Sequence, residues 1–359
     1  MKGKDKVATL IRHISTFLNQ WAPPGIKMDY DNVGLLVGDS NTEVSSVLTC
    51  LDVTDEVVDE AIKKNCQLIV AHHPLIFGKI GSINPSNEQG RIIYKLIKND
   101  IGLLVAHTNL DAALDGVSFV LANILGLDNL SFLDKSYDIS RKIRLVTDSK
   151  DPESVLKLLN YYSAEEAHYF SVENREHNLN CFEAIIDKHH VSTLRAGLKK
   201  EGLLKAGTFQ VTELASTSQN FGMGVVGEYP DDGVGKNEFL HLVSKALNVR
   251  AVRFSGDVDR IKRVAVCGGS GVSLTKAAIA AGAQAFITAD IKYHDYFTEK
   301  EGFLLVDVGH YESEFPIAEA LKNELSDAFE EISVSVTQTV TNPMKIYVSE
   351  IEPQSIHQS

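Results

Sequence analysis

Short, uninterrupted apolar runs alternate with amphipathic segments in the N-terminal and C-terminal parts of this chain. The runs lie in CQLIVAHHP (66–74), IGLLVAHTNLD (101–111) and GFLLVDVGHYESE (302–314). Runs without polar alternation are typical of strands that are buried on both faces in a parallel sheet. TLIRHISTFLNQW (9–21) and FPIAEALKNELSDAFEE (315–331) instead repeat apolar residues with a helical period. We therefore predict an α/β fold with parallel-rich sheets.

Three further segments of this α/β pattern carry expectations about where elements begin and end. DEVVDEAIKKN (55–65) predicts a helix for which Asp55, after Thr54, is a suitable N-cap. DAALDGVSFVLANILG (111–126) predicts one continuous helix that ends at Gly126. ISVSVTQTVTNPMKIYV (332–348) is rich in β-branched residues and predicts a strand.

The middle of the chain has a different pattern, with scattered charges and no pairing of histidine with carboxylate at the strand ends. KIRLVTDSKDPESVLKLLNYY (142–162) and LNCFEAIIDKHHVSTLRAGLKKEG (179–202) each predict a strand followed by a helix. Such a repeat indicates a small α+β unit of split-βαβ, ferredoxin-like character. We predict that residues 136–217 form this inserted domain, and that residues 1–135 and 218–359 together form a discontinuous α/β core.

Each of the three apolar runs ends in a histidine, and a second histidine or a carboxylate follows closely. These residues are His72, His73, His107, Asp111, His310 and Glu314. In open α/β sheets, ligands bind just beyond the carboxyl ends of the strands, so these side chains have a common place to meet. Histidine with carboxylate is the ligand set of a hydrolytic metal site. The pattern therefore indicates a metal-dependent protein.

Several of these residues also have a simpler interpretation. His72 and His73 are neighbours that would point to opposite faces of an extended strand, so they would not readily bind one ion side by side. If Pro74 ends the strand there, they could bind one ion each. Asp111 is equally consistent with a helix N-cap before AALDGV. Glu314 suits the first turn of a helix, where a negative charge is favoured. The metal interpretation is favoured because such residues follow the ends of all three apolar runs.

A fourth strand end and a glycine loop extend this picture. Asp290 and His294, in TADIKYHD, are candidate ligands, acid–base groups or residues that hold the ligands in place. VCGGSGVSLTK (266–276) is a glycine loop entering a helix, which suits either phosphate binding or a tight turn. It lacks the GK[ST] ending of a P-loop. Asp31 and Asn32, in DYDNVGLLVGD, suit either a pocket wall or a turn.

Composition narrows the class of protein. A length of 359 residues predicts two domains. The net charge of -13 argues against general nucleic-acid binding, which needs cationic side chains for the phosphates. We expect no membrane span, because no stretch approaches the ~20 apolar residues required. The four cysteines occur singly without a CxxC pair, so we expect reduced thiols and a cytoplasmic protein.

Six motifs taken together resemble the Nif three-like dinuclear metal-binding family, whose bacterial members are known as GTP cyclohydrolase I type 2 homologues. The motifs are YDNVGLLVGD, AHHPLIF, AHTNLDAA, VAVCGGSG, TADIKYHD and DVGHYESE. The resemblance covers roughly residues 1–135 and 218–359 and implies a two-lobed core. It implies two divalent ions and a bridging role for Glu314, while the histidine and carboxylate donors leave Zn, Fe, Mn and Ni as candidates. The ligands that it implies are His72, His73, Asp111, His310 and Glu314.

The resemblance also implies the remaining features of the site and the assembly. His107, Asp290 and His294 match further polar positions of the cavity, with His107 and His294 as proton-transfer candidates. Members with an insertion carry a PII- and CutA-like domain and form hexameric toroids. Here LLKAGTFQVTEL (203–214) stands where the family has an HPYE-like segment, and the glycine-rich hairpin motif is absent.

Two functions follow from this sequence. The first is a dinuclear metal-dependent hydrolase acting on a purine nucleotide, for which the resemblance suggests GTP. The alternative is a metal-binding scaffold or regulatory protein that forms a toroidal homo-oligomer, a hexamer, and has no turnover of its own. In both cases we expect neither a membrane nor nucleic acid as a partner.

Overall fold

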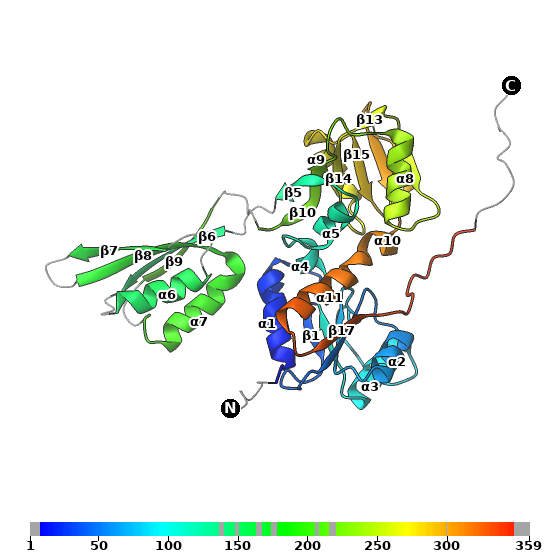
Figure 1. Cartoon of the computed structure of the whole chain (residues 1–359). Helices are drawn as coiled ribbons and strands as arrows, with labels where there is room; N and C mark the ends of the chain where they lie inside the picture. Colours follow the sequence, from blue (N-terminus) through cyan, green and yellow to red (C-terminus); the bar gives the residue numbers. More distant parts are fainter. Residues whose placement is uncertain are drawn as a thin grey trace, which may run out of the picture.

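The structure is a computed structural model of the 359-residue chain, shown in Figure 1. Its described residues are 8–135, 140–147, 151–162, 167–173, 178–204, 208–214, 220–298 and 300–347. They form two sheets with covering helices, and a further sheet that projects to one side (Figure 1). The predicted mixed α/β fold with parallel-rich sheets is therefore confirmed. Within these residues, no helix combines the length and apolar character needed to cross a membrane.

The first lobe is a five-stranded sheet with the order β1-β4-β3-β2-β17. Its strands are β1 (Gly34–Val37), β2 (Ser46–Cys50), β3 (Leu68–Ala71), β4 (Gly102–Val105) and β17 (Ser333–Val336). Its helices are α1 (Ile11–Trp21), α2 (Asp55–Lys63), α3 (Glu88–Lys98) and α11 (Pro316–Ala328). Only β1 runs antiparallel to its neighbour.

The packing of alternate residues of β3 explains why the sequence of this strand is an unbroken apolar run. Leu68 and Val70 pack with α1 and α11 on one face, whereas Ile69 and Ala71 pack with α2 and α3 on the other. Both faces are dry, so polar alternation would bury unpaired polar groups. The parallel strands also end at one edge, and this edge carries the histidines.

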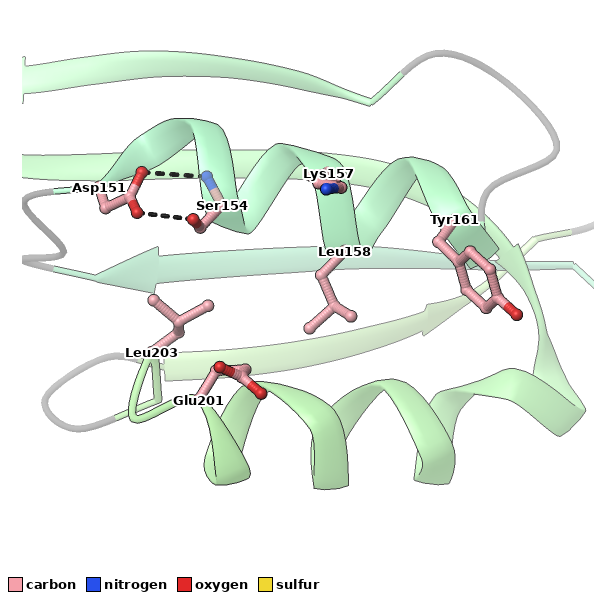
Figure 2. Close-up of a pocket in the computed structure, with 7 residues that line it drawn as sticks. All are labelled: Asp151, Ser154, Lys157, Leu158, Tyr161, Glu201 and Leu203. Carbon is pink, nitrogen blue, oxygen red and sulfur yellow. Dashed lines mark hydrogen bonds between the residues drawn. The ribbon is translucent and has the colours of Figure 1, made fainter. Parts of the chain in front are cut away.

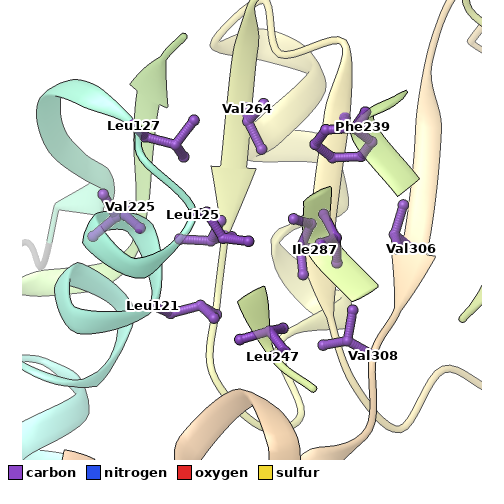
Figure 3. Packing of buried hydrophobic residues seen from close by; sticks show 14 of the residues in the cluster. Leu121, Leu125, Leu127, Val225, Phe239, Leu247, Val264, Ile287, Val306 and Val308 are labelled. Atoms are coloured by element: carbon purple, nitrogen blue, oxygen red, sulfur yellow. The ribbon is translucent and has the colours of Figure 1, made fainter. Parts of the chain in front are cut away.

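The second lobe is a six-stranded sheet with the order β12-β16-β15-β14-β10-β5, in which β14, β15 and β16 are parallel. Its strands are β5 (Asp128–Lys135), β10 (Gly222–Glu228), β12 (Arg253–Gly256), β14 (Arg263–Val266), β15 (Ala285–Thr288) and β16 (Leu304–Asp307). Its helices are α5 (Val117–Ile124), α8 (Lys236–Ala246) and α9 (Thr275–Ala280), and a short ribbon pairs β11 (Val234–Gly235) with β13 (Arg260–Ile261). Leu121 of α5 and Phe239 of α8 pack onto one face of this sheet around Ile287 (Figure 3).

Between β5 and β10 the chain forms a four-stranded antiparallel sheet with the order β7-β8-β6-β9. Its elements are β6 (Ser140–Thr147), α6 (Pro152–Tyr162), β7 (His168–Glu173), β8 (Asn178–Asp187), η2 (Lys188–His190), α7 (Val191–Lys200) and β9 (Thr208–Glu213). This βαββαβ connectivity agrees with the predicted split-βαβ pattern. The predicted boundaries at residues 136 and 217 lie outside the described residues.

Two features of this unit were not predicted from the sequence. The first is the edge strand β7, on which Tyr169 and Phe170 are neighbours and both are about half exposed, so no alternation marks the strand. The second is a cavity of about 520 Å³ beside α6 (Figure 2). It is lined by Asp151, Ser154, Lys157, Leu158, Tyr161, Glu201 and Leu203.

Three predicted element boundaries are wrong. Thr54, not Asp55, caps α2, because its side chain accepts from the Val57 N–H at 3.3 Å while Asp55 pairs with Lys95. The strand predicted for 332–348 ends at Val336, where its pairing with β2 ends.

The single helix predicted for 111–126 is two helices, α4 (Thr108–Asp111) and α5. The chain turns between α4 and α5. Asp115 has φ +58°, and a Cβ at Gly116 would lie 1.9 Å from the Leu110 carbonyl oxygen. Asp111 therefore ends a helix and is not an N-cap.

Candidate metal centre

The histidines and carboxylates meet where the carboxyl ends of strands from both lobes face each other. β3 ends at Ala71, so His72 and His73 are not held to opposite faces, and their ring centroids lie 5.1 Å apart. From the second lobe, β16 ends at Asp307 and the short helix α10 (His310–Glu314) begins three residues later. α10 starts at His310, and this one turn places His310 and Glu314 on the same face.

In the part of the chain that the structure describes, three groups of side chains could hold a metal ion, with the ligand atoms of each group within 4.8 Å of one another. The groups are His72 with His73 and His107, His73 with His310 and Glu314, and His72 with Asp111 and Glu314. The structure thus brings together the five predicted ligands and also His107. We call these six residues the candidate metal centre.

The four histidines are oriented in the same way, each with Nδ1 against an oxygen acceptor. The pairs are His72 with the Ala106 carbonyl at 2.8 Å, His73 with Asp52 at 2.7 Å, His107 with Asp31 at 2.8 Å, and His310 with Asp290 at 2.6 Å. A carbonyl or a carboxylate accepts, so Nδ1 donates and Nε2 is the atom directed to the centre. This is the arrangement found around metal-binding histidines.

Two atoms of the centre are buried without a hydrogen bond. They are Nε2 of His72 and Oδ1 of Asp111, which lie 3.4 Å apart. A buried polar atom normally has a partner, and its lack costs free energy. Imidazole nitrogen and carboxylate oxygen without thiolate are suitable donors for several divalent ions. The residues present therefore fit a metal ion.

The electrostatics of the centre are dominated by Glu314, which is 4% exposed. Its Oε2 lies 2.9 Å from Nε2 of both His73 and His310. Burial raises the pKa of Glu314, but hydrogen bonds from His310 and His73 outweigh it and hold the pKa well below the usual range.

The histidines that contact Glu314 change in the opposite sense. Burial lowers the pKa of His73, but Asp52 and Glu314 raise it to about 10. The hydrogen bond with Glu314 is the main reason that the pKa of His310 rises to about 9. By contrast, burial and the charge of His72 lower the pKa of His107. The centre thus contains two imidazoles that hold protons and one that releases its proton easily.

The glycine loop, for which the sequence allowed either phosphate binding or a tight turn, is a wall of the centre. The N–H of Gly268 donates to Ser118 Oγ at 3.3 Å, and the N–H of Gly269 to Ser313 Oγ at 3.0 Å. The N–H of Gly271 is also used within the protein, so the loop follows the tight-turn interpretation. Gly269 has φ +59°, and a Cβ there would lie 2.0 Å from Oε1 of Glu314.

Of the remaining predicted site residues, Asp290 contacts the centre through His310. Asp290 is exposed and has φ +56°, an uncommon backbone conformation directly after β15. His294 belongs to none of the three groups. It lies exposed on the turn η4 (Tyr293–Tyr296) and lines a surface cavity of about 810 Å³ with residues such as Ser273 and Lys276.

Sequence reasoning missed Asp52 and left the role of Asp31 open. Asp52 follows the end of β2 at Cys50, so the same strand-end rule that found the histidines was available to find it. Asp31 is 6% exposed and accepts from His107 and from the Thr108 N–H at 3.0 Å. Asn32 donates to the Ile76 carbonyl at 2.9 Å and belongs to the loop rather than to the centre.

Solved structures support the fold. A Staphylococcus aureus protein of known crystal structure matches with a TM-score of 0.77 and 34% identity, and the match covers 95% of this chain and 99% of that one. A Bacillus cereus protein described as related to NIF3 matches with a TM-score of 0.77 and 28% identity over 95% of this chain and 99% of its own.

Sequence relatives cover nearly the whole chain as well. A protein of Staphylococcus aureus strain MSSA476, named GTP cyclohydrolase 1 type 2 homolog, is 35% identical over 92% of this chain and 98% of its own length. Residues 9–343 match the profile of the family described as Duf34/NIF3 (NGG1p interacting factor 3). The chain therefore belongs to the Duf34/NIF3 family.

Proposed function

We propose that this protein is a dinuclear metal-dependent hydrolase that acts on a purine nucleotide, with GTP as the first substrate to test. One observation carries the proposal: four imidazoles with Nδ1 already held converge on two carboxylates, and two of the converging atoms are buried without a hydrogen bond. The name of the relatives, GTP cyclohydrolase 1 type 2 homolog, supports the choice of substrate.

In this proposal each of two ions has its own pair of ligands. His72 and Asp111 would hold one, and His73 and His310 the other. Glu314 would bridge them, which is supported by its membership of both groups. Zn, Fe, Mn and Ni all accept this donor set. The chemistry that such ions supply is Lewis acidity, which polarises an oxygen and makes a water nucleophilic near neutral pH.

The chain's own residues would manage the protons. His107 is neutral near pH 7 because its pKa is lowered, and its Nδ1 is occupied by Asp31, so Nε2 is the atom that would accept a proton. We assign Asp290 to holding His310 rather than to proton transfer, because its Oδ2 lies 2.6 Å from Nδ1 of that residue. His294, on the turn after Asp290, is the second proton-transfer group that we propose.

For a cyclohydrolase reaction, one water attacks C8 of guanine and opens the imidazole ring, and a second water hydrolyses the resulting formamide so that formate leaves. Metal-loaded protein is incubated with GTP and a panel of nucleotides, and the products are identified by mass spectrometry. We expect formate with a ring-opened or pterin triphosphate, and neither from a His310→Ala variant. A phosphate-releasing product would keep the hydrolase and change its substrate chemistry. No product at full metal occupancy would contradict the proposal.

A second candidate function is a metal-binding regulatory protein or scaffold, in which a PII-like inserted domain, residues 136–217, senses or recruits a partner. One contact favours it: η2 of the insert contacts η1 (Pro24–Ile26), which precedes the loop of Asp31. We propose a hexameric toroid as the assembly in either case, to be tested by light scattering. This candidate predicts no turnover and partner capture that depends on the metal, so capture unchanged by a chelator would exclude it.

A further inference from the structure

The C-terminal segment 337–342, here named the C-terminal strap, runs beside the candidate metal centre. β17 pairs in parallel with β2, and beyond it the Thr337 N–H donates to the Thr49 carbonyl at 2.9 Å. Because the two strands point the same way, the chain leaves β17 at the edge where Asp52 follows β2. The pairing therefore delivers the strap to the edge of the sheet that carries the histidines.

Hydrogen bonds fix the strap at both of its ends. At its start, Glu60 of α2 accepts from Thr337 Oγ1 at 2.6 Å and from Thr339 Oγ1 at 2.8 Å. At its other end, Asn342 Nδ2 donates at 2.8 Å to Glu312, which lies in α10 between His310 and Glu314. The strap thus links α2 of the first lobe to the helix that supplies ligands from the second.

Between these anchors, the strap contacts the residue that orients His73. Thr341 Oγ1 donates to Oδ2 of Asp52 at 2.6 Å, while Oδ1 of the same carboxylate lies 2.7 Å from Nδ1 of His73. The two partners occupy different oxygens, so together they fix the rotation of the carboxylate. This matters because the Asp52 side chain is 34% exposed and would otherwise have room to rotate.

We propose that Thr341 is a positioning residue of the metal centre, which holds His73 in its ligand orientation through Asp52. The inference rests on the proposed function, because it assumes that His73 binds an ion. The hydroxyl is the group that acts, since the Thr341 methyl cannot satisfy a carboxylate oxygen. Loss of a residue that orients a metal-bound histidine typically costs 10–100-fold in metal affinity. Thr341 acts one contact further out, so we expect a loss of about tenfold.

The test uses the full chain, stripped of metal by a chelator and then titrated with Mn²⁺ or Zn²⁺ by calorimetry. Thr341→Val removes the hydroxyl and keeps the volume, and Thr341→Ser restores the hydroxyl. Thr339→Val is the matched control, because its hydroxyl lies in the same strap but bonds Glu60. The Co²⁺ absorption spectrum of each variant reports separately on the ligand geometry, and thermal unfolding of the metal-free proteins reports on folding.

We expect Thr341→Val to weaken the binding of one of the two ions and to alter the Co²⁺ spectrum, while Thr341→Ser and Thr339→Val behave like wild type. Equal affinity of Thr341→Val and wild type would overturn the inference alone. Equal weakening by Thr339→Val would overturn it too, because the strap would then act only through its general order. A wild-type protein that binds no divalent ion would instead remove the proposed function and this inference together.

Discussion

His72 and Asp111 face each other across 3.4 Å, with Nε2 of the one and Oδ1 of the other buried and unbonded. Two such atoms would be satisfied together by a cation placed between them, whereas an apolar neighbour would satisfy neither. The pair therefore gives the first prediction about metal binding.

We expect Asp111→Asn to bind one divalent ion per chain instead of two. The amide is a weaker ligand than the carboxylate, so the loss of metal affinity should exceed the ~10–100-fold effect of replacing an orienting residue. Metal content after gel filtration measures it. Asp115→Asn, an exposed change at the neighbouring turn, serves as the control. Two retained ions in Asp111→Asn would contradict the assignment.

Glu314→Gln should have a larger effect, because Glu314 belongs to two of the three groups. We expect both ions to be lost at micromolar metal, as the bridging carboxylate is replaced by a neutral amide. Equilibrium dialysis of the variant against Zn²⁺ measures this. Glu319→Gln, in α11 and directed to solvent, should bind as wild type does. Loss of only one ion would argue against a bridge.

Metal binding should release roughly two protons per chain at pH 7, because a bound imidazole cannot keep its proton at the ligand atom. The pKa of His73 is raised to about 10 and that of His310 to about 9, so both are protonated in the metal-free protein at pH 7. Affinity should therefore rise with pH up to about 9–10. Calorimetry in buffers of different ionisation enthalpy counts the protons, and a count near zero would contradict the raised pKa values.

The same shifts set the stability of the metal-free protein. A group whose pKa is raised by folding stabilises the folded state fully at a pH below its unfolded pKa, here near 6.5. This stabilisation is lost as the pH rises through about 9–10. We expect the free energy of unfolding of wild type to fall between pH 7 and pH 10 more than that of His310→Ala. Urea unfolding in the presence of a chelator measures the difference.

Gly269→Ala should displace Glu314, since a Cβ there would lie 2.0 Å from Oε1 of that residue. The left-handed backbone adds a strain of roughly 1–2 kcal/mol. Gly282→Ala separates the two effects, because Gly282 has φ +77° but no atom within 4 Å of the Cβ position. We expect both variants to lose stability and only Gly269→Ala to lose metal. Unchanged metal affinity in Gly269→Ala would show that the centre does not need this close approach.

Glu60 predicts an acid-sensitive attachment of the C-terminal strap. Burial raises the pKa of Glu60, but Lys64 and the strap lower it to about 2. A group whose pKa is lowered by folding stabilises the folded state at a pH above its unfolded pKa, here near 4.5. This stabilisation is lost as the pH falls toward about 2. Glu60→Gln should cost about 1.5–3 kcal/mol at pH 7, and the difference from wild type should shrink below pH 4.5. Urea unfolding as a function of pH measures it, with the exposed Glu56→Gln as the control.

Much of the candidate metal centre could be predicted because its histidines follow strands that the sequence itself marks. LIVA before His72, LLV before His107 and LLVD before His310 are short apolar runs, and all three are buried strands. A local pattern suffices here, since the carboxyl ends of parallel strands meet at one edge whatever the other lobe does. The suggestion of Asp111 as an N-cap was wrong. The turn at Asp115 and Gly116 depends on contacts with Leu110, which a local pattern does not reveal.

By itself, the sequence determined the buried strands of the two lobes and the histidines that follow them, but not the edge strand β7 or the break between α4 and α5. Only the tertiary structure decided which of them touch. His73 and Glu314 are 241 positions apart, and Thr341 and Asp52 are 289 apart. The first contact forms because the second lobe packs against the first, and the second because β17 pairs in parallel with β2. Local periodicity does not encode such contacts, since they depend on how separate hydrophobic surfaces are buried against each other.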